Sequence, residues 1–282
     1  MSEDMWDTVI TSNKKWFNPE LKELLQFRDL LMIFVKRDVI TIYKQTIFGP
    51  LWYLAQPLLV MLIYILVFTN IANIPTDEVP PALFYLSGII VWNYFNECLM
   101  QTSDTFYENT SIYSKVYFPR IIIPLSKIIS SLLKFAIQFS LFLIIFIYIY
   151  SSSDNVLAPN SSMQLLPLYL MITAMLALGA GLLITSITVK YRDLKFVFTF
   201  MTQLFMYASP VIYPISMLNE QYRQIMFFNP LSHILEGFKY AFLGVGEINS
   251  AGIAYSLFIS SLILFAGLIV FNKRQQTYID YI

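Results

Sequence analysis

The chain has 282 residues, of which 57% are hydrophobic and 13% are charged, and its formal net charge is zero. A soluble protein of this length does not need so much apolar surface, whereas runs of about 20 apolar residues can cross a bilayer, so we expect an integral membrane protein. The single cysteine, Cys98, excludes an intrachain disulfide, and the balanced charge gives no indication of nucleic-acid binding.

Residues 1–48 are predicted to form a cytosolic N-terminal region. The first 20 residues are polar and lack the apolar core of a signal peptide, so we expect no cleaved signal. Within 20–47, apolar residues recur close to helical spacing and are interleaved with lysine and arginine. This pattern predicts an amphipathic helix in the cytosolic membrane interface, and a solvated helix packed on the protein is the alternative.

A membrane domain is predicted at 49–275, followed by a cytosolic tail at 276–282. Its apolar segments should be helices, because a helix satisfies its own backbone hydrogen bonds in lipid. The predicted spans are 51–72, 82–103, 125–150, 164–188, 195–215 and 252–271. The fold class is therefore an all-α polytopic membrane protein with six transmembrane helices.

The distribution of basic residues predicts the topology. Seven lysines and arginines precede the first span, and others lie in the 104–127 and 189–195 segments and in the tail, whereas the 73–81 and 151–163 loops have none. Positively charged connections stay in the cytosol. We therefore expect cytosolic termini and an external location for 73–81, 151–163 and 216–250.

The 216–250 connection is too charged to cross the membrane and too apolar for a free loop. The Asn-Pro pair within it should divide it into two short helices that dip into the outer leaflet as an external gate. The candidate gate residues are Asn229, Pro230, His233, Glu236 and Lys239. The last three fall at i, i+3 and i+6, so neighbours among them can bond on one short helix. A metal site would need more ligands, so a structural polar cluster is favoured.

The cytosolic segment 106–124 carries a second candidate site. Pro119 and Pro124 restrict the backbone, and aromatic and basic side chains between two spans are typical anchors of a protein interface. The candidate contacts with a cytosolic ATPase are Tyr113, Lys115, Tyr117, Phe118 and Arg120. A solvated turn whose basic residues only set the topology is the alternative.

The chain lacks motifs for its own energy supply or catalysis. None of its nine glycines opens a phosphate-binding loop. Its carboxylates lie mostly outside the predicted spans, which argues against a proton-coupled secondary transporter. A membrane-embedded glycosyl- or acyltransferase would need converging acid, base or metal ligands, and those present are scattered. We expect a transport subunit, not an enzyme, with no cofactor or metal of its own.

The stretch KVYFPRIIIPLS resembles the cytosolic coupling segment of ABC-2-type export permeases, specifically those that move O-antigen, capsule or teichoic acid polysaccharides. Four more stretches are similar and occur in the family's order: IYKQTIFGPLWYLAQPLL, VKYRDLK, SPVIYP and NPLSHILEGFKY. The resemblance covers about 40–275. Two departures occur: KQTIFG stands where the family often has R-x-S-x-LG, and Lys239 stands where it often has arginine.

This resemblance implies a homodimer of six-span subunits in the bacterial cytoplasmic membrane, working with two copies of a separate nucleotide-binding ABC ATPase that carries ATP and magnesium. It also implies that the N-terminal amphipathic helix and the 108–120 segment form the docking surface. The implied cargo is a lipid-linked polysaccharide. Among the candidate cargoes, O-antigen is favoured, and teichoic acid or capsule is the alternative. A drug or small lipid is the less favoured cargo.

A glycan channel needs stacking surfaces, because aromatic faces bind the C–H groups of sugars. The candidate lining residues are Tyr53, Tyr64, Tyr85, Trp92, Tyr94, Phe95, Tyr207 and Tyr213. Anchoring at the membrane interface and packing between helices are the alternatives.

Glu97 and Lys134 are the charges deepest within the predicted spans. Such residues rarely face lipid, and the two fall at similar depth, so they are expected to pair. Two alternative roles of Lys134 are that its ammonium group snorkels to the cytosolic interface or that it binds phosphates of the substrate.

Overall fold

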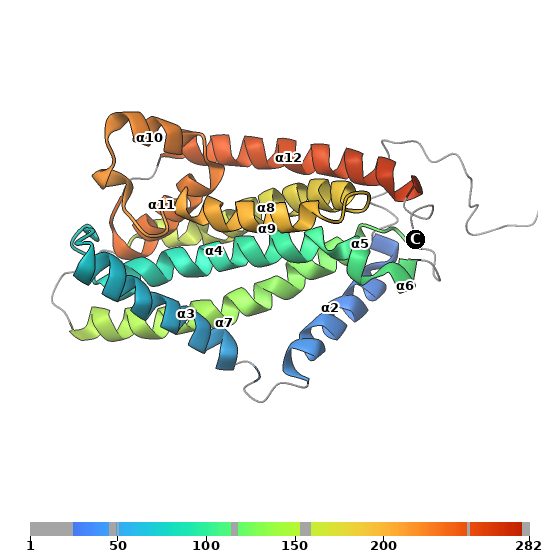
Figure 1. Cartoon of the computed structure of the whole chain (residues 1–282). Coiled ribbons are helices and arrows are strands. Elements are labelled where there is room, and N and C mark those ends of the chain that lie inside the picture. Colours follow the sequence, from blue (N-terminus) through green and yellow to red (C-terminus); the bar gives the residue numbers. More distant parts are fainter. Residues whose placement is uncertain are drawn as a thin grey trace, which may run out of the picture.

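A computed structural model describes residues 25–44, 49, 51–113, 118–152, 159–246 and 249–277. Within these ranges every regular element is a helix (Figure 1). This agrees with the predicted all-α class.

The helices follow one another along the chain with short connections. They are α2 (Arg28–Tyr43), α3 (Leu51–Tyr64) with its π-helical continuation η1 (Ile65–Ile71), α4 (Pro81–Ser103), α5 (Thr105–Glu108), α6 (Thr110–Tyr113), α7 (Ile122–Ser152), η2 (Ser161–Leu165), α8 (Leu166–Thr188), α9 (Leu194–Tyr207), η3 (Ile215–Met217), α10 (Glu220–Phe227), α11 (Pro230–Leu243) and α12 (Ser250–Thr277).

Four described segments are long and apolar enough to cross a membrane, and they coincide with four of the predicted spans. They are Leu51–Ile71, Ile122–Ser152, Ser161–Thr188 and Ser250–Arg274. The chain is therefore a polytopic membrane protein. α4 has 23 residues and the length to cross, about 35 Å. α9 has 14 residues, about 21 Å, which is shorter than a hydrocarbon core of about 30 Å. The count of six spans stays a prediction.

The predicted span 195–215 is wrong at its outer end. α9 ends at Tyr207, because Pro210 lacks an N–H donor and disfavours the helical conformation of the residue before it. The irregular backbone that follows is buried against α4, so closely that a Cβ atom on Gly88 would lie 2.9 Å from the carbonyl oxygen of Val211. Irregular backbone is tolerated at membrane depth where protein covers it in this way.

α4 is the centre of the molecule. It packs against α3, α7, α8 and α11, and every residue from 83 to 92 is buried. A helix that is apolar around its whole circumference is expected in such a position. Figure 1 shows α4 running between α7 on one side and α8 with α9 on the other.

α8 and α12 form the most extensive helix pair, and glycines allow their close approach. A Cβ atom on Gly179 would lie 2.5 Å from the backbone of Leu264, and one on Gly267 would lie 2.5 Å from the carbonyl oxygen of Gly179. Small residues at a membrane helix interface let the backbones come this close, so that van der Waals contact holds the helices together.

The connections that were predicted to be cytosolic lie together at one end of the molecule. Lys195, at the start of α9, pairs with Asp104 beyond α4 at 2.8 Å. Phe106 of α5 stacks on Phe271 of α12 with ring centroids 4.7 Å apart. Both contacts lie at the end that carries α5 and α6 in Figure 1.

The connections that were predicted to be external lie at the opposite end. Ser216 donates a hydrogen bond to Asp77 Oδ1 at 2.7 Å, and Asn160 Nδ2 donates to the carbonyl oxygen of Tyr240 at 2.9 Å. The two groups of connections therefore separate as the basic residues predict, whereas the orientation of the molecule in the membrane stays a prediction.

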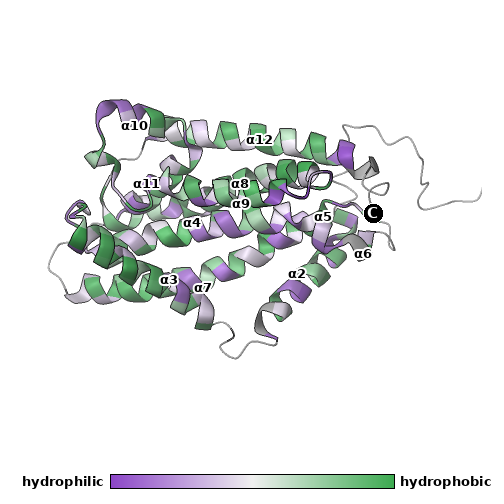
Figure 2. Ribbon diagram, in the orientation of Figure 1, coloured by the Kyte–Doolittle hydropathy of each residue, from purple (hydrophilic) through white to green (hydrophobic). Residues whose placement is uncertain are grey.

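α2 lies beside α7 near the α5 end. Phe34 is its buried contact, while Met32, Ile33 and Ile40 are exposed. The exposed apolar side chains fit a helix at the membrane interface, and Figure 2 shows hydrophilic and hydrophobic residues mixed along α2. Its contact with α7 fits the alternative of a helix packed on the protein. The interfacial position and the domain boundaries stay predictions.

Candidate functional site

The two deep charges lie together. Lys134 Nζ on α7 contacts Glu97 Oε1 on α4 as an ion pair. Gln101 Nε2 donates to the same carboxylate oxygen, and the ring of Tyr53 on α3 lies 5.2 Å from Lys134 Nζ. The expected pairing is therefore seen in the structure, and the ammonium group has a second contact with the face of an aromatic ring.

Uncharged amides extend this pair into a polar groove between α3, α4 and α7. Asn93 Nδ2 donates to Gln138 Oε1 at 3.2 Å. A cavity of about 80 Å³ lies beside them and is also lined by Gln56, Glu97 and Lys134. We call this set of five side chains the polar groove. It offers hydrogen-bond donors and acceptors to a hydroxylated ligand.

The sequence reasoning missed the three amides of the polar groove, although a signal for two of them was available. Asn93 lies one helical turn from Glu97, and Gln138 lies one turn from Lys134. Residues at i and i+4 share a helix face, so the two deep charges predicted where polar partners should lie.

Four of the predicted lining aromatics are buried within the chain: Tyr85, Trp92, Tyr94 and Phe95. Trp92 and Phe95 both contact the ring of Phe205, at 6.0 and 6.1 Å between centroids. Tyr94 packs on Phe135 at 5.4 Å. These contacts explain the burial by packing between helices, and a channel-lining role for the four residues stays a prediction.

The other four predicted lining aromatics keep some exposed surface: Tyr53, Tyr64, Tyr207 and Tyr213. Tyr64 on α3 donates a hydrogen bond to Met206 Sδ on α9 at 3.7 Å, so these two helices adjoin. Tyr213 donates to the carbonyl oxygen of Tyr207 at 3.1 Å. Tyr207 itself is 58% exposed.

The predicted ATPase contacts are only partly described, since Lys115 and Tyr117 lie outside the described residues. Tyr113 and Phe118 are buried, and their rings stack at 5.7 Å between centroids. Phe118 also packs on Phe34 of α2 at 5.8 Å. These two aromatics therefore join the segment to the rest of the chain, which leaves them little surface for a partner. Arg120 lies over the Tyr113 ring at 5.8 Å and is only partly buried.

A network of charges joins α2 to this segment. Asp38 Oδ1 accepts from Arg37 at 2.8 Å and lies 3.5 Å from Lys127 Nζ. Lys127 also lies 3.6 Å from Glu108 of α5. The network ties α2, α5 and α7 together, so that a displacement of the 106–124 segment would act on the apolar helix α7. The sequence reasoning did not find it.

The Asn-Pro pair divides the 216–250 connection into α10 and α11, as predicted. Asn229 Oδ1 accepts from the backbone N–H of Leu231 at 3.0 Å and caps α11. Its Nδ2 donates to the carbonyl oxygen of Ala208, at 3.2 Å, and to Ser209 Oγ. Pro230 holds the first position of the helix, where no backbone donor is needed. Asn229 thus caps the start of α11 and also hydrogen-bonds to the two residues that follow α9.

Lys239 is fully buried and donates a hydrogen bond to the irregular backbone that follows α9. Its Nζ donates to the carbonyl oxygen of Pro210 at 2.6 Å, lies 4.0 Å from the centroid of the Phe84 ring, and lies 3.8 Å from Glu236 Oε1. Burial lowers the pKa of Lys239, and the charge of Glu236 opposes the change. These contacts agree with the structural polar cluster favoured for this helix, and a gating role stays a prediction.

His233 makes contacts within the outer helices. Its Nε2 lies 2.9 Å from the carbonyl oxygen of Phe227, and its ring packs on Gly252, where a Cβ atom would meet it at 2.4 Å. Burial lowers the pKa of His233, which therefore favours the neutral ring. Among the described residues no group of three or more His, Cys, Asp or Glu side chains could hold a metal ion.

A sequence profile of the family described as "ABC-2 type transporter" matches residues 29–243. The O-antigen export system permease protein RfbA of Klebsiella pneumoniae is 25% identical over 252 residues, which cover 89% of this chain and 94% of that protein. A protein of the same name from Myxococcus xanthus is 25% identical over 269 residues, covering 93% and 98%. The polysialic acid transport protein KpsM of Escherichia coli is 20% identical over 241 residues, covering 85% and 91%.

Proposed function

Because the chain belongs to the ABC-2 type transporter family, we propose that it is the membrane subunit of an ATP-driven polysaccharide exporter. The observation that carries the proposal is the match over nearly the full length of permeases named for O-antigen export. The resemblance inferred from the sequence motifs is confirmed at the level of the family.

The proposed cargo is a lipid-linked polysaccharide, with O-antigen placed first. Two of the relatives are named for O-antigen export and a more distant one for polysialic acid transport. Export of another polysaccharide, such as a capsule, is therefore the second candidate, and teichoic acid or a small lipid or drug has no support from these names. The polar groove, which contains Glu97 and Lys134, supports a cargo with many hydroxyl groups.

We propose a homodimer with the export channel at the interface of its subunits. α3 and α9 adjoin through Tyr64 and Met206, and both present exposed apolar side chains. These are Leu59, Leu62 and Ile63 on α3, Leu66 on its continuation η1, and Phe196, Phe200, Leu204 and Tyr207 on α9. A second copy on this surface would bring two sets of exposed aromatic residues together, and a row of aromatic faces suits a glycan that slides.

Energy in the proposed exporter comes from two copies of a separate ABC ATPase in the cytosol. The α5 end of the molecule is the docking surface in this proposal, because it holds the basic connections and the charge network of Asp38 and Lys127. The proposed location is the bacterial cytoplasmic membrane, with both termini of this chain in the cytosol.

Deletion of the gene in its host tests the proposal. Surface polysaccharide should disappear while lipid-linked polymer accumulates at the inner face of the membrane, because synthesis continues without export. The gene on a plasmid should restore the surface polymer. Gel profiles of O-antigen, capsule and wall teichoic acid from the same cells identify the cargo.

Normal amounts of all three surface polymers in the deletion strain would contradict the proposal. A changed sensitivity to drugs, with every surface polymer intact, would favour the small-molecule exporter instead. Purification of the tagged chain from the complemented strain tests the partner, since an ABC ATPase should be recovered with it.

A further inference from the structure

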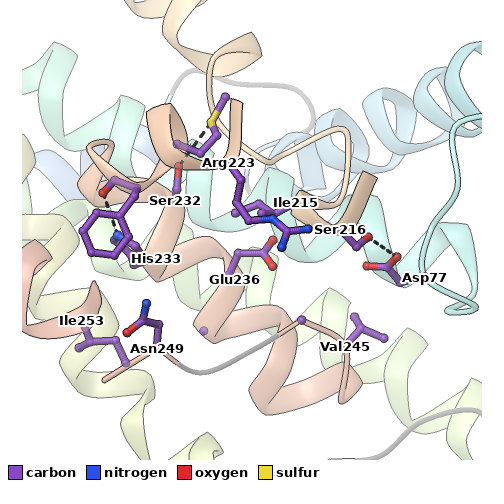
Figure 3. Close-up of a pocket in the computed structure, with 14 residues that line it drawn as sticks. Asp77, Ile215, Ser216, Arg223, Ser232, His233, Glu236, Val245, Asn249 and Ile253 are labelled. Carbon is purple, nitrogen blue, oxygen red and sulfur yellow. Dashed lines mark hydrogen bonds between the residues drawn. The ribbon is translucent and has the colours of Figure 1, made fainter. Parts of the chain in front are cut away.

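A cavity of about 470 Å³ lies at the end of the molecule opposite to α5 and α6, between α10, α11 and the start of α12 (Figure 3). It is larger than the cavity of the polar groove and shares no lining residue with it. Pockets that take small ligands have volumes of roughly 300–1,000 Å³. The cavity therefore has room for one or two sugar residues.

Five polar side chains that reach the cavity come from five separate segments. They are Asp77, Ser216, Arg223, Glu236 and Asn249. Figure 3 shows the guanidinium of Arg223 between Glu236 on one side and Ser216 with Asp77 on the other. Asp77 has a positive φ of 49°, which a residue other than glycine rarely adopts, and backbone of this kind is found at ligand sites.

Among the described residues, the charges at and directly behind the cavity are balanced. Asp77 and Glu236 bring two carboxylates, Arg223 brings one cation, and Lys239 lies behind Glu236 at 3.8 Å. Glu236 Oε1 accepts no hydrogen bond from any described residue. A free anion would be repelled by the two carboxylates, and the described residues offer no cluster for a metal ion. The balance favours a ligand without net charge that carries many hydrogen-bonding groups.

The other lining residues include the polar side chains of Ser232 and His233 and the apolar side chains of Met226, Phe227 and Ile253. Phe227 packs on Tyr255 with ring centroids 5.6 Å apart. A sugar ring presents hydroxyl groups around its edge and C–H groups on its face. Carboxylate, guanidinium and amide groups together with the ring of Phe227 match both surfaces, whereas a lipid tail would leave the polar groups unpaired.

We propose that this cavity is a saccharide-binding site, which holds a neutral or zwitterionic sugar unit by hydrogen bonds to Asp77, Arg223 and Glu236. The inference rests on the proposed function, since it identifies the sugar unit with a segment of the exported polymer. The site lies within one subunit and apart from the channel proposed at the subunit interface, on the surface of α3 and α9. A polymer held there contacts the outer helices α10 and α11 as it leaves.

The test measures binding to the purified full-length permease in lipid nanodiscs. The probes are oligosaccharides of one to three repeat units, prepared from the delipidated surface polysaccharide of the host strain, with dextran fragments of equal length as a comparison. Saturation-transfer NMR and calorimetry report binding. The lining variants are Asp77→Asn and Arg223→Gln.

Each lining variant has a matched control. Glu78 is exposed, also has a positive φ and is the next residue after Asp77, but it does not line the cavity. Gln224 is the exposed neighbour of Arg223 on α10 and does not line it either. The lining variants should weaken binding at least about tenfold, because each removes a charged hydrogen-bonding partner. Glu78→Gln and Gln224→Ala should change the affinity less than about twofold.

Unchanged affinity in both lining variants, with folding verified by thermal unfolding, would overturn the site. The site would also be overturned if the wild-type permease bound none of the oligosaccharides. If that same permease restored surface polymer in the deletion strain, the proposed function would still stand. Failure of the wild-type gene to restore any surface polymer would instead contradict the proposed function, whatever the cavity binds.

Discussion

Lys134 of α7 pairs with Glu97 of α4, so the two charges placed deepest in the predicted spans neutralise each other at the interface of these helices. The carboxylate also accepts from Gln101, and the ammonium lies over the Tyr53 ring. The pair joins three helices, because α3 contributes the aromatic face. Removal of either charge leaves the other in a setting that disfavours an isolated ion.

The first prediction concerns this pair. Lys134→Met and Glu97→Gln should each lower the free energy of unfolding by about 3 kcal/mol, because one charge stays partly buried and unpaired. The double variant should lose less than the sum of the two, since both charges are gone. Thermal unfolding of the purified permease in one detergent measures all four proteins.

Lys134→Arg is the control, because it keeps the cation. Additive losses in the double variant would show that the two residues act independently. A Lys134→Met variant as stable as wild type would instead indicate that the ammonium reaches the membrane interface and does not need Glu97.

Much of the helical arrangement could be predicted from the sequence, because apolar length and proline carry local information. The break at Asn229 and Pro230 followed from their chemistry, since asparagine caps a helix and proline starts one. The pairing of Glu97 with Lys134 followed from equal depth in neighbouring helices. Each of these inferences used residues close in sequence or the thickness of the bilayer.

Contacts between distant segments could not be predicted in this way. Ser216 meets Asp77 across 139 positions of the sequence, and no periodicity links the two. Tyr113 and Phe118 have the residue types of interface anchors, yet they stack on each other and pack on the chain's own helices. Aromatic residues serve cores and interfaces alike, so their burial depends on tertiary packing that a sequence pattern does not contain.

The second prediction concerns the contact of α8 with α12. Gly179→Ala should destabilise the permease, because the new Cβ atom would lie 2.5 Å from the backbone of Leu264. Overpacking typically costs about 1–3 kcal/mol, whereas the same change in an open helix stabilises by about 1 kcal/mol. A lower melting temperature of Gly179→Ala would therefore indicate overpacking against α12, and a higher one would indicate that the position is open. Ala254→Leu, at an exposed position of α12, is the control and should have little effect.

The third prediction concerns the pH dependence that arises from Lys239. Burial lowers its pKa from the usual 10.5, so between the lowered value and 10.5 the unfolded chain binds more protons at this residue than the folded chain does. The contribution of Lys239 to stability should therefore rise with pH across this window. The melting temperature of wild type minus that of Lys239→Met should increase from neutral to alkaline pH. A constant or falling difference would contradict the lowered pKa.

The fourth prediction separates folding from ATPase coupling at the α5 end. Phe118→Ala should lower the free energy of unfolding by about 3 kcal/mol, because it removes a buried ring that packs on Phe34 and Tyr113. Arg120→Glu should lower the melting temperature less than Phe118→Ala does, since Arg120 keeps part of its surface exposed, and it should reduce recovery of the ATPase with the tagged permease or uncouple ATP hydrolysis from export. Lys190→Glu, in the turn before α9, should do less than Arg120→Glu. Normal export and normal ATPase recovery with Arg120→Glu would show that the coupling contact lies elsewhere at this end.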